Sequence, residues 1–185
     1  MNLLGICGSL RASSFNRMAL ELARASLPEG VTMTVADLRA IPMYDGDLQA
    51  AGMPAEVLAL AASIRKADGI VIATPEYNFS IPGMLKNAID WASRVDNQPF
   101  AGKPAAILSA STGPVGGARV QYDLRKVLLF VNAMTMAKPE VFIGMAATKF
   151  DESGSCTDDA TRKFVAAQMT AMKTWVERVQ RMDAA

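Results

Sequence analysis

The sequence predicts an α/β protein built on a doubly wound parallel sheet, because short apolar segments alternate with segments of helical periodicity along all 185 residues. The apolar segments have the length of strands that are buried on both faces of a sheet. Right-handed crossovers between parallel strands place helices on both faces. The sequence contains no linker-like or low-complexity stretch, so we expect one domain over residues 1–185.

The first half of the chain opens with an apolar strand, Leu3–Cys7, followed by a Ser-rich turn and a helix over Asn16–Ser26. The second strand, Val31–Ala36, alternates apolar and polar residues, which is typical of an edge strand with one wetter face. A helix over Pro54–Lys66 follows, since proline is favoured at the first helical position.

The second half repeats this alternation and ends in a long amphipathic helix. The expected strands are Gly69–Thr74, Ala105–Ser109 and Glu140–Ile143. The expected helices are Met84–Ser93, Ala118–Val131 and Asp158–Arg181. The last helix carries apolar residues at steps of four and three, namely Val165, Met169, Met172, Val176 and Val179. We interpret this stripe as core or subunit interface rather than as a cofactor site.

The composition excludes several kinds of catalysis. The chain has no histidine, which removes Ser-His-Asp and Cys-His nucleophiles, His-ligated zinc and histidine acid–base chemistry. Cys7 and Cys156 stand far apart and form no CxxC pair, so neither a redox dithiol nor a metal site is expected. An enzyme of this composition must use carboxylates, backbone dipoles or an organic cofactor.

Charge and hydropathy also limit the partners. The 19 Lys and Arg residues balance 18 Asp and Glu residues, which argues against nucleic acid as a partner. No apolar run approaches the roughly 18 residues of a membrane span. The apolar N-terminus lacks the basic segment of a signal peptide. We therefore expect a cytoplasmic protein with no membrane span.

The loop after the first strand has the composition of a phosphate site. Ligands of open α/β sheets bind beyond the carboxyl ends of the strands. Residues Gly8–Asn16 supply small residues, hydroxyls, an amide and the Arg11 guanidinium at a helix N-terminus. The GxGxxG and GxxxxGK[ST] fingerprints are absent. A polar loop with a Ser or Asn helix cap is the alternative interpretation.

Two further loops follow at the same edge of the predicted sheet. In Thr74–Gly83, two prolines and a glycine frame Tyr77 and Phe79, whose flat apolar surfaces suit a planar heterocycle. In Ser109–Ala118, three glycines permit close approach of the backbone to a ligand. Ordinary strand-to-helix turns are the alternative at each loop. The three loops together predict a mononucleotide pocket.

At these residues the sequence resembles the NADPH-dependent FMN reductase family, and within it the bacterial quinone and chromate reductases of the flavodoxin-like superfamily. The matching stretches are GSLRASSFN at 8–16, TPEYNFSIPGMLKNAIDW at 74–91, GGARVQYDLR at 116–125 and KPE at 138–140. The resemblance covers essentially the whole chain. It implies a flavodoxin-like five-stranded parallel sheet of order 2-1-3-4-5 and noncovalent FMN.

The resemblance also assigns the site residues, in three groups. Those expected at the FMN phosphate are Ser9, Arg11, Ser14 and Asn16. Those expected to line the isoalloxazine, largely through backbone groups, are Pro75, Glu76, Tyr77 and Asn78. Those expected to close the other edge of the flavin are Ser111, Gly113, Gly116 and Gly117. Because the flavin does the redox chemistry, no protein side chain is expected to be catalytic.

The chemistry that the resemblance implies is a two-electron ping-pong reaction. NADPH or NADH delivers hydride and leaves, and then a quinone, another flavin or a metal oxyanion such as chromate is reduced. A flavodoxin-type electron carrier is the alternative, although such carriers are typically strongly acidic and this chain has a net charge of +1. A flavin-free regulatory domain on the same fold is a second alternative.

The resemblance further implies a homodimer or homotetramer. Arg119, Tyr122 and Glu140 match positions of a hydrogen-bond network between subunits in tetrameric relatives. Those relatives have a tyrosine where this chain has Phe79, so the network lacks one hydroxyl here.

Overall fold

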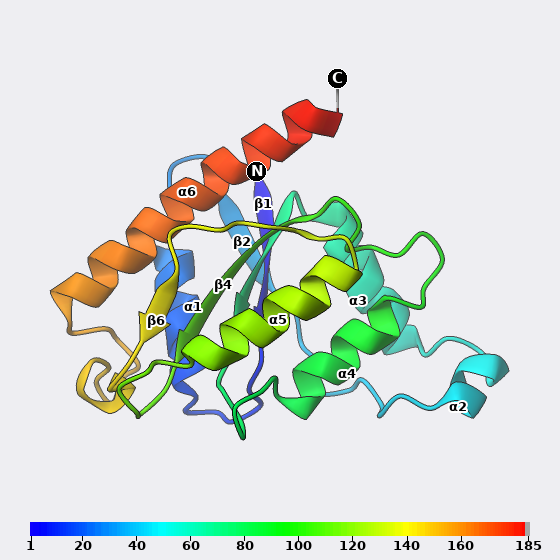
Figure 1. Ribbon diagram of the computed structural model, residues 1–185, viewed down its shortest axis with the longest axis horizontal. Helices are drawn as coiled ribbons and strands as arrows, with labels where there is room; N and C mark the ends of the chain where they lie inside the picture. The colour runs from blue at the N-terminus through cyan, green and yellow to red at the C-terminus, as the bar shows by residue number, and fades with distance from the viewer. Residues whose placement is uncertain (184–185) are drawn as a thin grey trace.

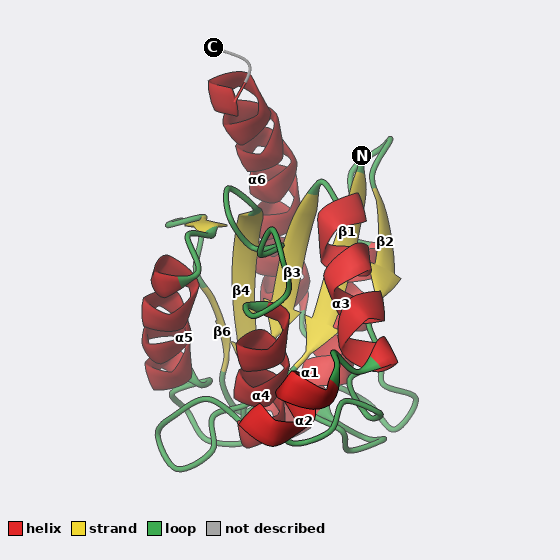
Figure 2. Ribbon diagram, turned by 90° about the vertical axis from the view of Figure 1, so that its right-hand side faces the viewer, coloured by secondary structure: helices red, strands yellow, loops and turns green. Residues whose placement is uncertain are grey.

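The computed structural model describes residues 1–183 and contains a parallel sheet with helices on both faces (Figures 1 and 2). The strands are β1 (Asn2–Cys7), β2 (Thr32–Val35), β3 (Gly69–Ala73), β4 (Pro104–Ala110), β5 (Met134–Thr135) and β6 (Val141–Ile143). Their order is β2-β1-β3-β4-β5, and β6 also pairs with β4. The predicted fold class and the predicted strand order are confirmed. Residues 184–185 of the expected single domain lie outside the described residues.

The helices fall into two layers. They are α1 (Phe15–Ala25), α2 (Gly46–Ala51), α3 (Ala55–Lys66), α4 (Gly83–Ala92), α5 (Ala118–Phe130) and α6 (Asp159–Asp183). One buried cluster joins the sheet to α1 and α6, and a second joins its other face to α3, α4 and α5. Within the described chain, no helix has both the length and the hydropathy to span a membrane.

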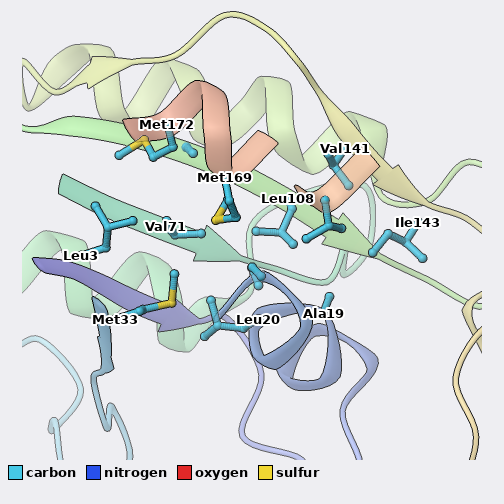
Figure 3. Packing of buried hydrophobic residues seen from close by; sticks show 14 of the residues in the cluster. Leu3, Ala19, Leu20, Met33, Val71, Leu108, Val141, Ile143, Met169 and Met172 are labelled. Atoms are coloured by element: carbon cyan, nitrogen blue, oxygen red, sulfur yellow. The ribbon is translucent and has the colours of Figure 1, made fainter. Parts of the chain in front are cut away.

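Figure 3 shows part of the first cluster, where side chains from the sheet pack against α1 and α6. Leu3, Val71 and Leu108 come from β1, β3 and β4, and Leu20 and Met169 come from α1 and α6. All five are almost completely buried. The apolar stripe of the last helix was interpreted above as core or as subunit interface. The structure shows that it belongs to the core.

The fifth position of the sheet differs from the prediction of one strand over Glu140–Ile143. Two short strands occupy this position: β5 pairs with the beginning of β4, and β6 pairs with the end of β4. Pro139 lies between them and has no N–H to donate, so a continuous ladder along β4 is not available there.

The helix α2 falls in a segment for which the sequence analysis expected no element. Asp45 caps it, accepting a hydrogen bond from the N–H of Asp47 at 2.8 Å. None of its six residues is buried, and in Figure 1 it lies at the periphery of the molecule. A short helix without an apolar face leaves no periodicity to detect.

Candidate functional site

The loops after β1 and β3 are packed closely together at the carboxyl edge of the sheet. A Cβ on Gly8 would lie 2.5 Å from Oγ1 of Thr74, so a larger residue would push the two loops apart. The N–H of Gly8 donates to the carbonyl of Ala73 at 2.8 Å, which continues the pairing of β1 with β3 into the loops. The beginning of the predicted phosphate loop is thereby fixed.

The hydroxyls of that loop organise its backbone. Ser14 is the N-cap of α1, and its Oγ accepts from the N–H of Asn16 at 3.2 Å. Oγ of Ser9 accepts from the N–H of Arg11 at 3.4 Å. Both serines are buried, and each hydroxyl oxygen acts as an acceptor in these two contacts. The exposed Arg11 donates to the carbonyl of Ser13 at 2.7 Å.

The same loop carries a run of unpaired backbone donors. Among the described residues, no protein acceptor faces the N–H groups of Ser9, Leu10, Ala12, Ser13 and Phe15. Unpaired N–H groups at a helix N-terminus, together with the positive end of the helix dipole, are suited to anions. With two hydroxyls and one guanidinium beside them, they form a donor set that fits a phosphate dianion.

Asn16 connects α1 to the end of β4. Its Nδ2 donates to the carbonyl of Ala110 at 2.9 Å, and its Oδ1 accepts from the N–H of the same residue at 2.8 Å. The side chain is buried, and both of its polar atoms are engaged by the protein. One amide hydrogen remains for a phosphate, the role that the resemblance implies for this residue.

Cys7 ends β1 directly before the phosphate loop. Its Sγ lies 3.5 Å from the carbonyl oxygen of Ser9. Burial raises the pKa of the Cys7 thiol above its ordinary value. The group therefore remains a thiol at neutral pH and supplies no nucleophilic thiolate to the site.

The loop after β3 contains a tight turn with an unusual backbone. Tyr77 and Ser80 exchange two backbone hydrogen bonds, at 3.1 and 3.0 Å. Between them, Asn78 and Phe79 have φ angles of 50° and 67°. Asparagine enters the left-handed region more readily than most residues, but a bulky residue such as phenylalanine seldom does. Tyr77 and Phe79 are more than half exposed, and they present aromatic surface to solvent.

Glu76, which precedes this turn, caps α5 from a distance. Its Oε2 accepts from the N–H groups of Arg119 and Val120 at 3.1 and 3.3 Å. The N-cap residue of α5 is Gly117, which has no side chain to do so. A carboxylate at this position also interacts favourably with the helix dipole. Glu76 is a residue expected at the flavin from the sequence, but its role as a cap has no local signal because the partners lie 43 residues apart.

The glycines of the loop after β4 are required by the protein itself. Gly116 and Gly117 have φ angles of 64° and 78°. A Cβ on Gly116 would lie 2.8 Å from the backbone N of Gly144, and one on Gly117 would lie 2.9 Å from Cβ of Ser109. These close approaches are to other parts of the chain, whereas the sequence analysis explained the glycines by approach to a ligand.

The remaining predicted residues of this loop are joined to β6. The N–H of Ser111 donates to the carbonyl of Ile143 at 3.0 Å, and its Oγ donates to the carbonyl of Gly113 at 3.1 Å. The structure therefore brings all three predicted groups to one edge of the sheet, beyond β1, β3 and β4. Figure 1 shows these loops along its lower side.

A parallel sheet of order 2-1-3-4-5, with a loop of unpaired backbone donors after β1 and an aromatic turn after β3, defines a flavodoxin-like protein. A profile of the NADPH-dependent FMN reductase family matches residues 1–148. The chain belongs to this family. It is an oxidoreductase that uses FMN, with NAD(P)H as the electron donor.

Individual relatives match over nearly the whole chain. An NAD(P)H-dependent FMN reductase of Pseudomonas aeruginosa is 47% identical over 180 residues, which cover 97% of each chain. A quinone reductase of Escherichia coli is 46% identical over 186 aligned positions, again with 97% of each chain covered. The structure of the flavoenzyme NAD(P)H:(acceptor) oxidoreductase from Paracoccus denitrificans is 36% identical and superposes with a TM-score of 0.88, covering 96% of this chain and 97% of that one.

Proposed function

We propose that this protein reduces quinones with two electrons that FMN receives from NAD(P)H. The observation that carries the proposal is the set of hydrogen-bond donors at the N-terminus of α1, which fits a phosphate. Tyr77 and Phe79 are exposed at the same edge of the sheet. Relatives at 46% and 40% identity are a quinone reductase and an NAD(P)H:quinone oxidoreductase, which supports quinones as the acceptor class.

In this proposal the loop after β1 binds the FMN phosphate. Ser9, Ser14 and Arg11 supply hydroxyl and guanidinium donors, and the unpaired backbone N–H groups supply the rest. Asn16 holds the loop against β4 and adds its remaining amide hydrogen. Charge-assisted hydrogen bonds of this kind are about twice as strong as neutral ones.

The loop after β3 lines the isoalloxazine. Its residues in the proposal are Pro75, Glu76, Tyr77 and Asn78, and the loop after β4 closes the other edge with Ser111, Gly113, Gly116 and Gly117. Within the described residues, the N–H groups of Asn78 and Phe79 have no protein acceptor. Such fixed donors stabilise negative charge that develops on a bound ring.

FMN supplies the redox chemistry by accepting hydride from NAD(P)H and passing two electrons to the acceptor. The protein binds and orients it, and leaves one aromatic-lined face accessible to both substrates in turn. A shared face implies a ping-pong order. It also admits other flat or anionic acceptors, including free flavins and metal oxyanions such as chromate.

The proposal includes a homo-oligomer, either a dimer or a tetramer, in the cytoplasm. The end of α5 exposes Leu129 and Phe130, by 77% and 88%. Exposed apolar side chains that lie close together on a surface are common in subunit interfaces. Sedimentation velocity of the purified protein distinguishes a dimer from a tetramer.

Initial rates of NADPH oxidation by the FMN-loaded protein test the function. With benzoquinone varied at several fixed NADPH concentrations, a ping-pong enzyme gives parallel double-reciprocal plots. Protein that binds FMN but leaves NADPH unoxidised would favour the electron carrier. Protein that binds no FMN would overturn the proposal, and chromate in place of benzoquinone tests the oxyanion.

A further inference from the structure

Arg119 contacts two residues of the loop after β3: Glu76, which precedes the tight turn, and Phe79, which lies within it. Its Nε and Nη2 are each 2.6 Å from Oε1 of Glu76. Its guanidinium carbon lies 3.9 Å from the centre of the Phe79 ring. Glu76 and Phe79 are three residues apart, so one side chain of α5 contacts both the residue before the turn and a central residue of the turn.

The turn needs support from outside because its backbone is strained. Asn78 and Phe79 both adopt left-handed conformations, which persist only where the surroundings hold them. The two hydrogen bonds between Tyr77 and Ser80 close the turn, but they do not fix its orientation relative to α5. The Phe79 ring is 65% exposed, so burial in the core does not hold it either.

Glu76, the acidic partner of Arg119, is held in place by its surroundings. The Glu76 side chain is only 8% exposed, and its carboxylate also binds two backbone N–H groups of α5. In the ion pair between Arg24 and Glu21 of α1, by contrast, both side chains are substantially exposed. Exposed pairs of that kind contribute little, since water screens them and each side chain loses freedom. The edge of the planar Arg119 guanidinium pairs with the Glu76 carboxylate, and the face of the guanidinium stacks on the Phe79 ring.

We propose that Arg119 is a positioning residue for the flavin ring. It clamps the turn against α5 and so fixes the backbone donors of Asn78 and Phe79 at the place where the ring binds. This inference rests on the proposed function, because it takes residues 75–78 as the lining of the isoalloxazine. The resemblance connected Arg119 with contacts between subunits, whereas here its partners lie in its own chain.

Two measurements on Arg119→Gln test the inference, and the first requires no flavin. Hydrogen exchange of the apoprotein reports on the backbone N–H groups of Tyr77 and Ser80, and we expect both to exchange several-fold faster. Fluorescence titration then gives the affinities for FMN and for riboflavin. Both are expected to fall by the same factor, about 5- to 20-fold, since the clamp acts at the ring and not at the phosphate.

Two other variants calibrate the effect. Arg119→Lys keeps the charge but loses the planar fork, so intermediate values are expected. Arg24→Gln removes an arginine of similar exposure from an ordinary helical ion pair, and it should match the wild type in both measurements. If Arg119→Gln does not fold, Phe79→Leu removes the stacked ring and leaves the cap on α5 in place, with the same expected loss of riboflavin affinity.

Each contrary result has a distinct meaning. Unchanged exchange at Tyr77 and Ser80 overturns the clamp. Faster exchange with unchanged riboflavin affinity overturns the positioning role, because the turn would then be a structural feature only. Loss of FMN affinity alone would place Arg119 at the phosphate and also overturn the inference. A wild-type protein that binds neither ligand overturns the proposed function and this inference with it.

Discussion

Gly144 lies directly against Pro114, so that a Cβ at position 144 would be 2.2 Å from the Pro114 carbonyl oxygen. Gly116 makes a second close approach, to the backbone of Phe142 and Gly144. The loop after β4 is thus packed backbone to backbone on the end of β6 and on Gly144, which follows it. This packing determines where Ser111 and the glycine-rich loop stand at the edge of the sheet.

Gly144→Ala is expected to destabilise the protein by about 1–3 kcal/mol, the usual cost of forcing extra volume into a packed site. Gly83→Ala is the matched control. Gly83 is the first residue of α4, and a Cβ there meets nothing within 4 Å, so alanine should be neutral or stabilising by up to about 1 kcal/mol. Urea unfolding of the two apoproteins measures both values. Equal stability of Gly144→Ala and the wild type would mean that the loop after β4 shifts to accommodate the added methyl group at little cost in free energy.

The parts of the fold that the sequence predicted are those with local signals. The apolar runs of β1, β3 and β4 are buried on both faces, and this burial is why they were recognisable. The segments that differed, α2 and the divided fifth position, are short and have little apolar periodicity. Their geometry depends on neighbouring elements rather than on their own residues.

In the candidate site, too, some features have local sequence signals and others do not. Its loops were predictable from residue types, since small and polar residues follow three buried strands. The side-chain partners were not, because Asn16 bonds to a residue 94 positions away and Glu76 to one 43 positions away. Such pairs are set by the tertiary fold, and no local pattern encodes them.

Asn16→Ala should cost about 2–4 kcal/mol of unfolding free energy. It leaves the N–H and the carbonyl of Ala110 buried without partners, and each unsatisfied buried group costs about 1–3 kcal/mol. Asn16→Asp keeps the acceptor but places a carboxylate oxygen against the Ala110 carbonyl, so it should be destabilising as well. Chemical unfolding of the apoproteins excludes any contribution from flavin. A loss below about 0.5 kcal/mol for both variants would show that water replaces the amide at this position.

In the Glu140→Gln variant, the unfolding free energy should fall less steeply with decreasing pH than it does in the wild type. The hydrogen bond from Lys138 holds the pKa of the Glu140 carboxyl below its ordinary value of 4.5. A depressed pKa in the folded state contributes stability above the ordinary pKa, and this contribution is lost as pH falls through the folded value. The difference in unfolding free energy between the wild type and Glu140→Gln should therefore be largest at neutral pH and shrink as the pH falls from about 5 to about 3, through and below that ordinary pKa. Thermal unfolding across this range measures it, and a constant difference would contradict the assignment.

Arg11→Ala should weaken FMN binding by about 1.5–3 kcal/mol, the usual contribution of a hydrogen bond to a charged group. Arg11 is exposed, and its guanidinium donates to the carbonyl of Ser13 and lies 5.6 Å from the centre of the Phe15 ring. Both contacts are local to the loop and the start of α1, so the guanidinium can turn toward a phosphate without disturbing the core. Riboflavin has no phosphate, and its affinity should stay close to the wild-type value. Arg24→Ala, in the last turn of α1, serves as the control for loss of a positive charge. Titration of the wild type and of both variants, each as apoprotein with both flavins, gives six affinities. Equal losses for FMN and riboflavin would mean that Arg11 supports the fold of the loop and does not bind the phosphate.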